Sequence, residues 1–355
     1  MGIVYIENFT AWASIASSTS EVDAMTNLAS QLSITPGNRA ASSCMQADYV
    51  WTGGRAWYHK NLLRTASTMW VTWRSSCDVA TTTSTCVSLF RLEETSTQHV
   101  IIGYTNNYEL CAYNHNKTVL YGKGPVLTQG AWHQFVAKVF ISDTVGTIEV
   151  RMDGIATPII NLTGLDTRNG GAGNISRIAV GETINVANIS PLATTTRIMD
   201  LAVWDNDGNS PSGWVGDVRV DDYTPSGDGS STQWTPLSST NYSQVDEAAA
   251  DYDTTYVYTS TNAQIDLYAM NNMTHNPPNI YSVSPNAVAK KIDAGTAQLK
   301  LKMVNGATTS TGAAETLTMG TYIRYIMHFG ANPDTATAWT VADVDAAEGG
   351  FESVL

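Results

Sequence analysis

The stretch TIEVRM (Thr147 to Met152), followed directly by Asp153-Gly154, decides the fold class of this chain. Its apolar residues fall on alternate positions, so Ile148, Val150 and Met152 lie on one face of a strand and the polar residues on the other. An Asp-Gly pair after such a run is a strong signal for a hairpin turn. The stretch therefore predicts a half-buried strand in an antiparallel sheet.

The same alternation recurs along the chain. It is clearest in AQLKLKM (Ala297 to Met303), where four apolar side chains face inward and three polar ones face solvent. Further short strands are predicted at His99 to Gly103, Tyr108 to Tyr113, Thr118 to Tyr121, Trp132 to Val139, Ile175 to Val180 and Arg197 to Trp204. Their spacing is typical of a double-sheet jelly roll, so the sequence predicts an all-β protein.

Length and composition indicate two domains. The chain has 355 residues, of which 14% are charged, and a length of this order fits about two domains. The most turn-rich stretch runs from Asp205 to Gly213, which places a hinge or a tight junction near Pro211. We expect a jelly-roll sandwich over residues 1–211 and a smaller antiparallel β-sandwich over residues 212–355.

Helix is predicted in two places. Glu21 to Leu32 carries apolar residues at helical spacing. Thr340 and Asp343 resemble a capping box that opens one short helix through Glu348, and Gly349-Gly350 is expected to end it.

Charge and termini exclude two classes of partner. A formal net charge of -13, without a cluster of Lys and Arg, repels a phosphate backbone, so nucleic acid is not an expected partner. The first residues form neither a signal peptide nor a span of apolar residues long enough for a bilayer. We expect synthesis in a cytoplasm and no membrane insertion.

Cysteine spacing gives no metal motif. Cys44, Cys77, Cys86 and Cys111 lack the C-x-x-C spacing of a zinc site. Cys77 and Cys86 bracket a polar stretch that would bring them close at a hairpin tip, whereas a reducing cytosol favours free thiols, so both states stay open.

Linear catalytic motifs are absent as well. The sequence lacks G-x-x-x-x-G-K-[ST], H-E-x-x-H and G-x-S-x-G, and it lacks a Glu-x-Asp-x-Glu strand that would supply the paired carboxylates of a glycoside hydrolase. Asp345 and Glu348 are interpreted as a solvated helix face. The sequence thus predicts a protein that is not an enzyme and that needs no cofactor.

Two sets of residues are candidates for binding. Asp205 and Asp207 supply oxygen ligands for calcium, although Asp-Asn-Asp-Gly is also a good turn sequence. The second set consists of polar and aromatic residues at predicted strand tips, where sugars could stack or hydrogen-bond. Its members are Tyr104, Asn106, Asn107, Tyr108, Asn114 and His115.

Ordered motifs in the second half resemble the C-terminal half of a family of bacteriophage virion structural proteins. They are GDVRV (from Gly216), PSGDG (from Pro225), QWTP (from Gln233), VDE (from Val245), DTTYV (from Asp253), DLY (from Asp266), DAGT (from Asp293) and PDTATAWT (from Pro333). In the first half, MGIVYIENF (from Met1), ITPGNRA (from Ile34) and the run from Trp132 to Asp207 look like the concanavalin-like (LamG-like) jelly roll of such proteins.

The resemblance implies a non-enzymatic virion component on the particle exterior. It favours a tail-associated fibre, baseplate or adhesin subunit that contacts host surface glycans, with capsid decoration as the alternative and a glycoside hydrolase as a further one. Implied partners are other virion proteins and copies of the chain itself, with a trimer favoured by the cyclic symmetry of phage particles.

Overall fold

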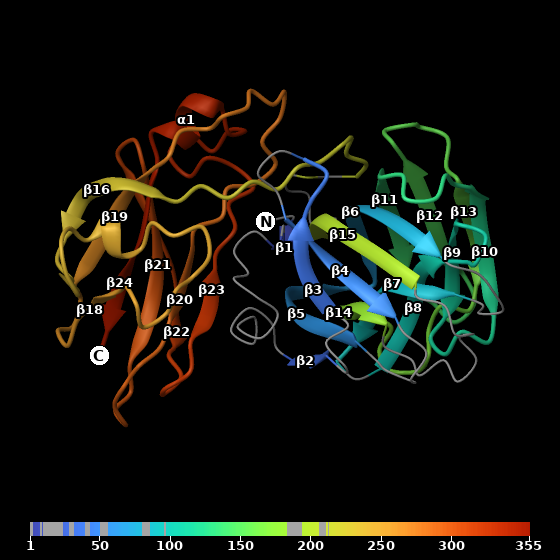
Figure 1. Ribbon diagram of the computed structural model, residues 1–355, viewed down its shortest axis with the longest axis horizontal. Coiled ribbons are helices and arrows are strands. Elements are labelled where there is room, and N and C mark those ends of the chain that lie inside the picture. Colours follow the sequence, from blue (N-terminus) through green and yellow to red (C-terminus); the bar gives the residue numbers. More distant parts are fainter. Residues whose placement is uncertain are drawn as a thin grey trace.

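Two groups of β-sheets make up the chain, one from residues 3–204 and one from residues 225–354, and they lie side by side (Figure 1). The computed structural model describes residues 3–7, 9, 24–27, 32–39, 43–49, 56–79, 86–95, 97–182, 194–205, 211 and 213–355. Within these ranges, no helix has the length and apolar character needed to cross a membrane. The all-β prediction is confirmed.

The first group is a sandwich of two antiparallel sheets, which we call sheets A and B. In order across sheet A, the strands are β13 (Ile160–Leu165), β12 (Gly146–Met152), β11 (His133–Phe140), β6 (Thr68–Val79), β15 (Thr194–Trp204), β4 (Ser43–Tyr49) and β3 (Leu32–Pro36), and β1 (Ile3–Glu7) also pairs with β15. Sheet B comprises β10 (Leu120–Val126), β9 (Glu109–Asn114), β8 (Thr97–Tyr104), β7 (Val87–Glu94), β14 (Ile175–Glu182), β5 (Ala56–Ala66) and β2 (Ala24–Asn27).

The core of this sandwich lies between the two sheets. Trp73 on β6 contacts Phe135 on β11 with ring centroids 5.2 Å apart, and it contacts Phe90 of sheet B at 4.8 Å. All three side chains are fully buried, as are Ile148 and Val150 on β12. Burial of this apolar area is the main stabilising contribution to the sandwich.

The turn after β12 also forms as predicted. Asp153 and Gly154 both have positive φ values, 51° and 73°, and the amide of Ile155 donates to the carbonyl of Met152 at 3.0 Å. The Asp153 carboxylate accepts a hydrogen bond from the amide of Gln134 at 2.9 Å and lies 2.7 Å from Nδ1 of His133. Those contacts explain His133 as a structural residue.

The second group is built around a five-stranded sheet C. Its order is β16 (Pro225–Thr232), β19 (Ile265–Met270), β24 (Glu348–Val354), β21 (Gln298–Asn305) and β22 (Thr308–Thr316). Two small pairs, β17 (Thr235–Pro236) with β18 (Val257–Tyr258) and β20 (Asn286–Ala289) with β23 (Ile323–Ile326), complete it, together with a 3₁₀ turn at Tyr242–Gln244. Leu299, Leu301 and Tyr325 form its core, against which Trp234 and Phe351 pack.

The predicted C-terminal helix forms, but it is shorter than expected. Helix α1 spans Val341–Asp345, with Thr340 and Asp343 in the reciprocal hydrogen bonds of a capping box. The prediction that Gly349-Gly350 ends the helix is wrong, because both glycines lie inside strand β24. A Cβ atom on Gly350 would lie 1.9 Å from the carbonyl oxygen of Asp266, so the close pairing of β24 with β19 requires glycine there.

The predicted helix at Glu21 to Leu32 is also wrong where the structure describes it. Ala24–Asn27 form β2, which pairs with β5 at the edge of sheet B, and Leu32 begins β3. Pairing with an existing sheet edge overrides a helical spacing of apolar residues, since secondary-structure preference is a weak signal beside tertiary contacts.

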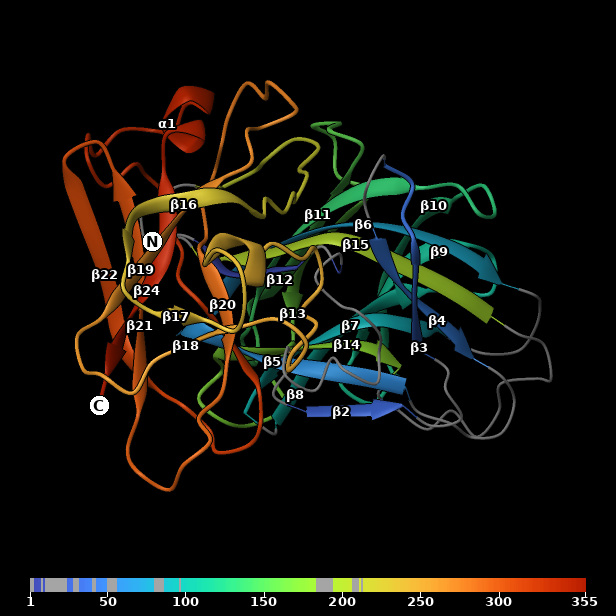
Figure 2. The ribbon, with the colours of Figure 1, turned by 60° about the vertical axis from the view of Figure 1, so that its left-hand side comes forward.

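The segment between β15 and β16 lies against sheet A, as Figure 2 shows from a second side. Val215 is buried with Trp70 and Trp204, and the ring of Trp214 lies 3.9 Å from the guanidinium of Arg151 on β12. The predicted boundary near Pro211 falls in this segment. It is a packed junction over the residues described here.

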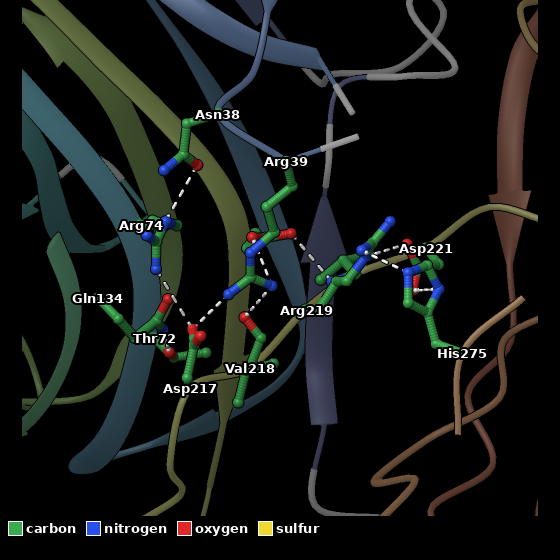
Figure 3. A network of polar contacts seen from close by, with 12 residues as sticks. Asn38, Arg39, Thr72, Arg74, Gln134, Asp217, Val218, Arg219, Asp221 and His275 are labelled. Carbon is green, nitrogen blue, oxygen red and sulfur yellow. Dashed lines mark hydrogen bonds and ion pairs between the residues drawn. The ribbon is translucent and has the colours of Figure 1, made fainter. Parts of the chain in front are cut away.

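A polar network fixes the junction (Figure 3). Arg39, which follows β3, donates to the carbonyl of Val218 at 3.1 Å and forms ion pairs with Asp217 and with Asp200 on β15. Asp200 in turn accepts from the amide of Val220 at 3.0 Å. Further along, Arg219 pairs with Asp221 and donates to Nε2 of His275 at 2.9 Å, which joins the segment to the second group of sheets.

Candidate functional site

Sheet B has two chemically different faces. One face carries Tyr58, Phe90, Ile102 and Val180, which belong to the sandwich core. Because side chains alternate along a strand, their neighbours in sequence lie on the opposite face. We call this opposite side the outer face of sheet B. The members relevant here are Trp57, His59, Asn61, Arg91, Glu93, Ile101, Tyr113, Arg177 and Ala179.

An ionic cluster occupies the centre of the outer face. Glu93 on β7 is fully buried, and its two carboxylate oxygens pair with different arginines. Oε1 accepts from Arg91, two residues earlier on the same strand, and Oε2 accepts from Arg177, its cross-strand neighbour on β14. Charge-assisted, multidentate pairs of this kind hold guanidinium groups in fixed orientations.

A row of side chains crosses the sheet through Arg91. Tyr113 on β9 is opposite Ile101 on β8, Ile101 is opposite Arg91, Arg91 is opposite Ala179 on β14, and Ala179 is opposite His59 on β5. Neighbouring strands lie about 4.8 Å apart, so the row from Tyr113 to His59 extends over roughly 19 Å. The Tyr113 hydroxyl and the His59 imidazole are therefore too far apart to act on one bond of a ligand.

Aromatic rings lie at the β5 end of this row. The Trp57 indole stacks on the His59 imidazole, with ring centroids 5.4 Å apart and planes inclined by 26°. Both side chains are half-buried, and Asn61, two residues further along β5, is exposed. Asn61 is the cross-strand neighbour of Arg177. An aromatic plane, an amide and a guanidinium thus lie on adjacent strands of one face.

The β9 end of the face is more apolar. Tyr113 contacts Cys86, Ile101 and Cys111 in a small buried cluster. Burial raises the pKa of Tyr113 to about 12, and the neighbouring thiols contribute in the same direction. The Lys117 ammonium lies over this end and donates to the carbonyl of Cys86 at 2.9 Å.

All four cysteines are free thiols. The neighbour of Cys86 in the structure is Cys111, with their sulfur atoms 3.3 Å apart, and of the two states left open for Cys77 and Cys86 the structure has the free thiols. The reason is strand order, because Cys86 and Cys111 flank β8 on the outer face whereas Cys77 belongs to the sandwich core.

The six residues predicted to contact a glycan do not come together. Tyr104, Asn106, Asn107 and Tyr108 lie at the turn before β9, whereas Asn114 and His115 lie at the turn after it. The six-residue strand β9 separates the two groups by roughly 20 Å. The six residues thus lie at two separate turns, and glycan contact by either group stays a prediction.

Individual members of that set have structural roles. The Tyr104 side chain is 2% exposed, and its hydroxyl lies 2.9 Å from the hydroxyl of Ser75 in the core. Asn114 accepts from the amides of Thr118 and Val119 and so closes its turn. His115 is half-buried, and burial lowers its pKa despite the opposing effect of Asp166. Asn106 and Asn107 are exposed.

The calcium prediction falls only partly on described residues. Asp205 is buried and pairs with Arg64 at 3.2 Å, while Asp207 lies outside the described residues. Among the residues that are described, no group of three or more His, Cys, Asp or Glu side chains could hold a metal ion. Calcium at this loop stays a prediction.

The paired carboxylates of a glycoside hydrolase are also not assembled on the described part of the outer face. Glu93 is opposite Gln98 near one end of β8, whereas Glu109 on β9 is adjacent in register to the other end, at Tyr104. Hydrolysis by two carboxylates requires a separation below about 10 Å. In addition, Glu109 is held by Lys123 at 2.8 Å.

Comparisons with known proteins bear on the fold. No protein-family model and no curated protein matches the chain. A sialidase structure is similar over 58% of this chain and 19% of its own, at 12% identity and a TM-score of 0.42. A cellulose-induced protein is similar over 60% of this chain and 100% of its own (16% identity, TM-score 0.41), as is an alginate lyase from Chlorella virus over 57% and 99% (10% identity, TM-score 0.40).

The prediction that the chain is not an enzyme is corrected by these matches. The solved structures that share its fold include a sialidase and alginate lyases, which are enzymes. The prediction relied on missing linear motifs, and a sandwich assembles its sites from separate strands, where a linear motif leaves no trace. At such low identity the likeness concerns the β-sandwich alone and assigns no reaction to this chain.

Sequence reasoning missed the outer face of sheet B. Its residues come from five strands, β5, β7, β8, β9 and β14, which are far apart in the sequence. The register that aligns them is set by tertiary pairing. One local signal was present, since Arg91 and Glu93 alternate with the core residues Phe90 and Leu92, which places two opposite charges on one face of a central strand.

Proposed function

We propose that this protein binds a polysaccharide at the end of the outer face of sheet B that is formed by β5 and β14. The observation that supports the proposal is the accessible end of that face, where the half-buried Trp57–His59 stack on β5 lies beside the exposed Asn61 and the partly exposed Arg177 on β14. Arg91 and Tyr113, further along the same row, are buried. Aromatic faces pack against the apolar sides of sugar rings, and guanidinium, amide and hydroxyl groups bind sugar oxygens.

The test is a binding measurement on a broad panel of polysaccharides by microarray, followed by titration calorimetry of the ligands that bind. Trp57→Ala is expected to weaken binding at least about tenfold, because it removes the aromatic plane. Trp214→Ala is the matched control, since Trp214 is a half-buried indole that lies over sheet A and contacts Arg151. Equal losses in both variants, or no binding across the panel, would refute the proposal.

The same samples should be assayed for newly formed chain ends. The proposal concerns binding alone. If the wild-type protein releases new chain ends and Arg91→Gln does not, the proposal extends to cleavage on this face. If the wild-type protein binds a polymer and leaves its length unchanged, the proposal remains one of binding without cleavage.

The virion role implied by the sequence motifs stays a prediction, as do the exterior location, the trimer and the partner virion proteins. A polysaccharide-binding face is compatible with a tail component that contacts host glycans. Immunogold labelling of particles would decide between tail and head, with tail labelling expected.

A further inference from the structure

Two guanidinium groups share one carboxylate at the centre of the outer face of sheet B, next to the proposed binding site. Arg91 and Arg177 both pair with Glu93, so the cluster as a whole carries one positive charge. A second ion pair near this face, Lys123 with Glu109, is neutral overall. The centre of the face is therefore positive, although the whole chain has a formal net charge of -13.

The Arg177 guanidinium contacts Glu93 along only one of its two edges. Its contacts with Glu93 involve Nε and Nη2, and the described residues supply no partner for Nη1. An arginine side chain has two edges that can each bind a carboxylate through paired N–H groups. With the Nε edge held by Glu93, the second edge is oriented in advance for another anion.

The surroundings of Arg177 suit an anionic sugar. Its side chain is 16% exposed, so the guanidinium reaches the surface while Glu93 beneath it is 1% exposed. Asn61 is its exposed cross-strand neighbour, and the Trp57–His59 stack lies on the same strand as Asn61. A sugar ring on the aromatic pair would place a ring substituent near the guanidinium.

We infer that the polysaccharide bound on this face is a polyuronate, whose carboxylates are bound by Arg177. This inference depends on the proposed function and narrows it to one class of ligand. The chain as a whole is acidic and repels a polyanion, so we assign the attraction to the place where two arginines share one glutamate. Binding should therefore weaken as salt is added.

The experiment compares polyuronates with the same polymers after reduction of their carboxylates to hydroxymethyl groups. Polygalacturonate and hyaluronate are suitable probes, with dextran sulfate as a polyanion that lacks carboxylates. Wild-type protein is expected to bind the polyuronates and to lose at least about tenfold in affinity for the reduced forms. This comparison uses unaltered protein, so folding of a variant does not affect it.

Variants then locate the contact. Arg177→Gln should weaken polyuronate binding by about the same factor as reduction of the polymer, and Arg177→Lys should recover part of it, because lysine keeps the charge and loses the paired N–H geometry. Arg151→Gln is the matched control, since Arg151 is likewise a partly exposed arginine that pairs with a glutamate, Glu149, but lies on the opposite sheet. Melting temperatures establish that each variant is folded.

The outcomes separate the inference from the proposed function. Equal binding of intact and reduced polymers would overturn the inference and leave polysaccharide binding in place. Binding of dextran sulfate without any polyuronate would also overturn it. If no polysaccharide binds, neutral or charged, the proposed function fails and the inference fails with it.

Discussion

At the residue scale, Asp200 couples the junction between the two groups of sheets to pH. Burial raises its pKa to about 6, although Arg39 and the Val220 amide act in the opposite direction. The folded protein thus holds this proton more tightly than the unfolded chain, where the pKa is near 3.8. Its contribution to stability is fully present below about pH 4 and is lost as the pH rises through about 6.

Replacement of Asp200 by Asn should remove this part of the pH dependence. Between pH 4 and pH 7, the free energy of unfolding of the wild type is expected to fall by up to about 3 kcal/mol more than that of Asp200→Asn. Urea unfolding at several pH values measures both profiles. Asp143→Asn, at an exposed carboxylate, is the control that should follow the wild type. Parallel profiles for Asp200→Asn and wild type would contradict the prediction.

Cys86 and Cys111 should be the first thiols to cross-link in this protein. Their sulfur atoms are 3.3 Å apart over Gly103, where a Cβ atom would lie 2.6 Å from the Cys86 sulfur. In oxidised glutathione, the two thiols would give up two protons and two electrons and form a disulfide, while the glutathione disulfide is reduced to two thiols. Peptide mass spectrometry is expected to find the Cys86–Cys111 link. A Cys77–Cys86 link, or no link, would contradict the close approach of the Cys86 and Cys111 sulfur atoms.

At the element scale, strand β24 depends on a residue without a side chain. It pairs with β19 on one side and β21 on the other, and a Cβ atom on Gly350 would overlap the backbone of Asp266. Gly350→Ala should destabilise the second group of sheets by about 1–3 kcal/mol, the usual range for overpacking. Thermal unfolding measures the change.

Gly227→Ala provides the control for that variant. Gly227 lies on β16 of the same sheet, and nothing is within 4 Å of its ideal Cβ position. Its melting temperature is expected to stay within about 2 °C of the wild type, whereas Gly350→Ala should fall by several degrees. Equal shifts in both variants would indicate a general intolerance of side chains rather than the close approach of β24 to β19.

At the scale of the whole molecule, Arg39 joins the jelly-roll sandwich to the segment that leads into the second group of sheets. Its guanidinium contacts Asp200, Asp217 and the carbonyl of Val218. Arg39→Ala leaves the carboxylate of Asp200 buried without this partner, which typically costs about 3–5 kcal/mol. We expect a lower melting temperature and faster protease cleavage near residue 217.

Arg168→Ala is the control for the junction, because Arg168 pairs at 3.3 Å with the exposed carboxylate of Asp143 and surface pairs contribute little. Its stability should change by less than about 1 kcal/mol. If Arg39→Ala melts like Arg168→Ala and its cleavage pattern is unchanged, the network of Figure 3 does not hold the junction together.

The sequence by itself determined the all-β fold class, the strand at Ile148 and Val150 with its Asp-Gly turn, and the capping box at Thr340. Each of these depends on neighbours in the chain, and alternation, turn chemistry and capping act over only a few residues. The tertiary structure alone decided that Gly349-Gly350 lie in a strand and that Ala24–Asn27 join a sheet edge. It also assembled the candidate site. Trp57, Arg91, Tyr113 and Arg177 lie on one face because strand order and register are set by packing across the sandwich, which no local pattern encodes.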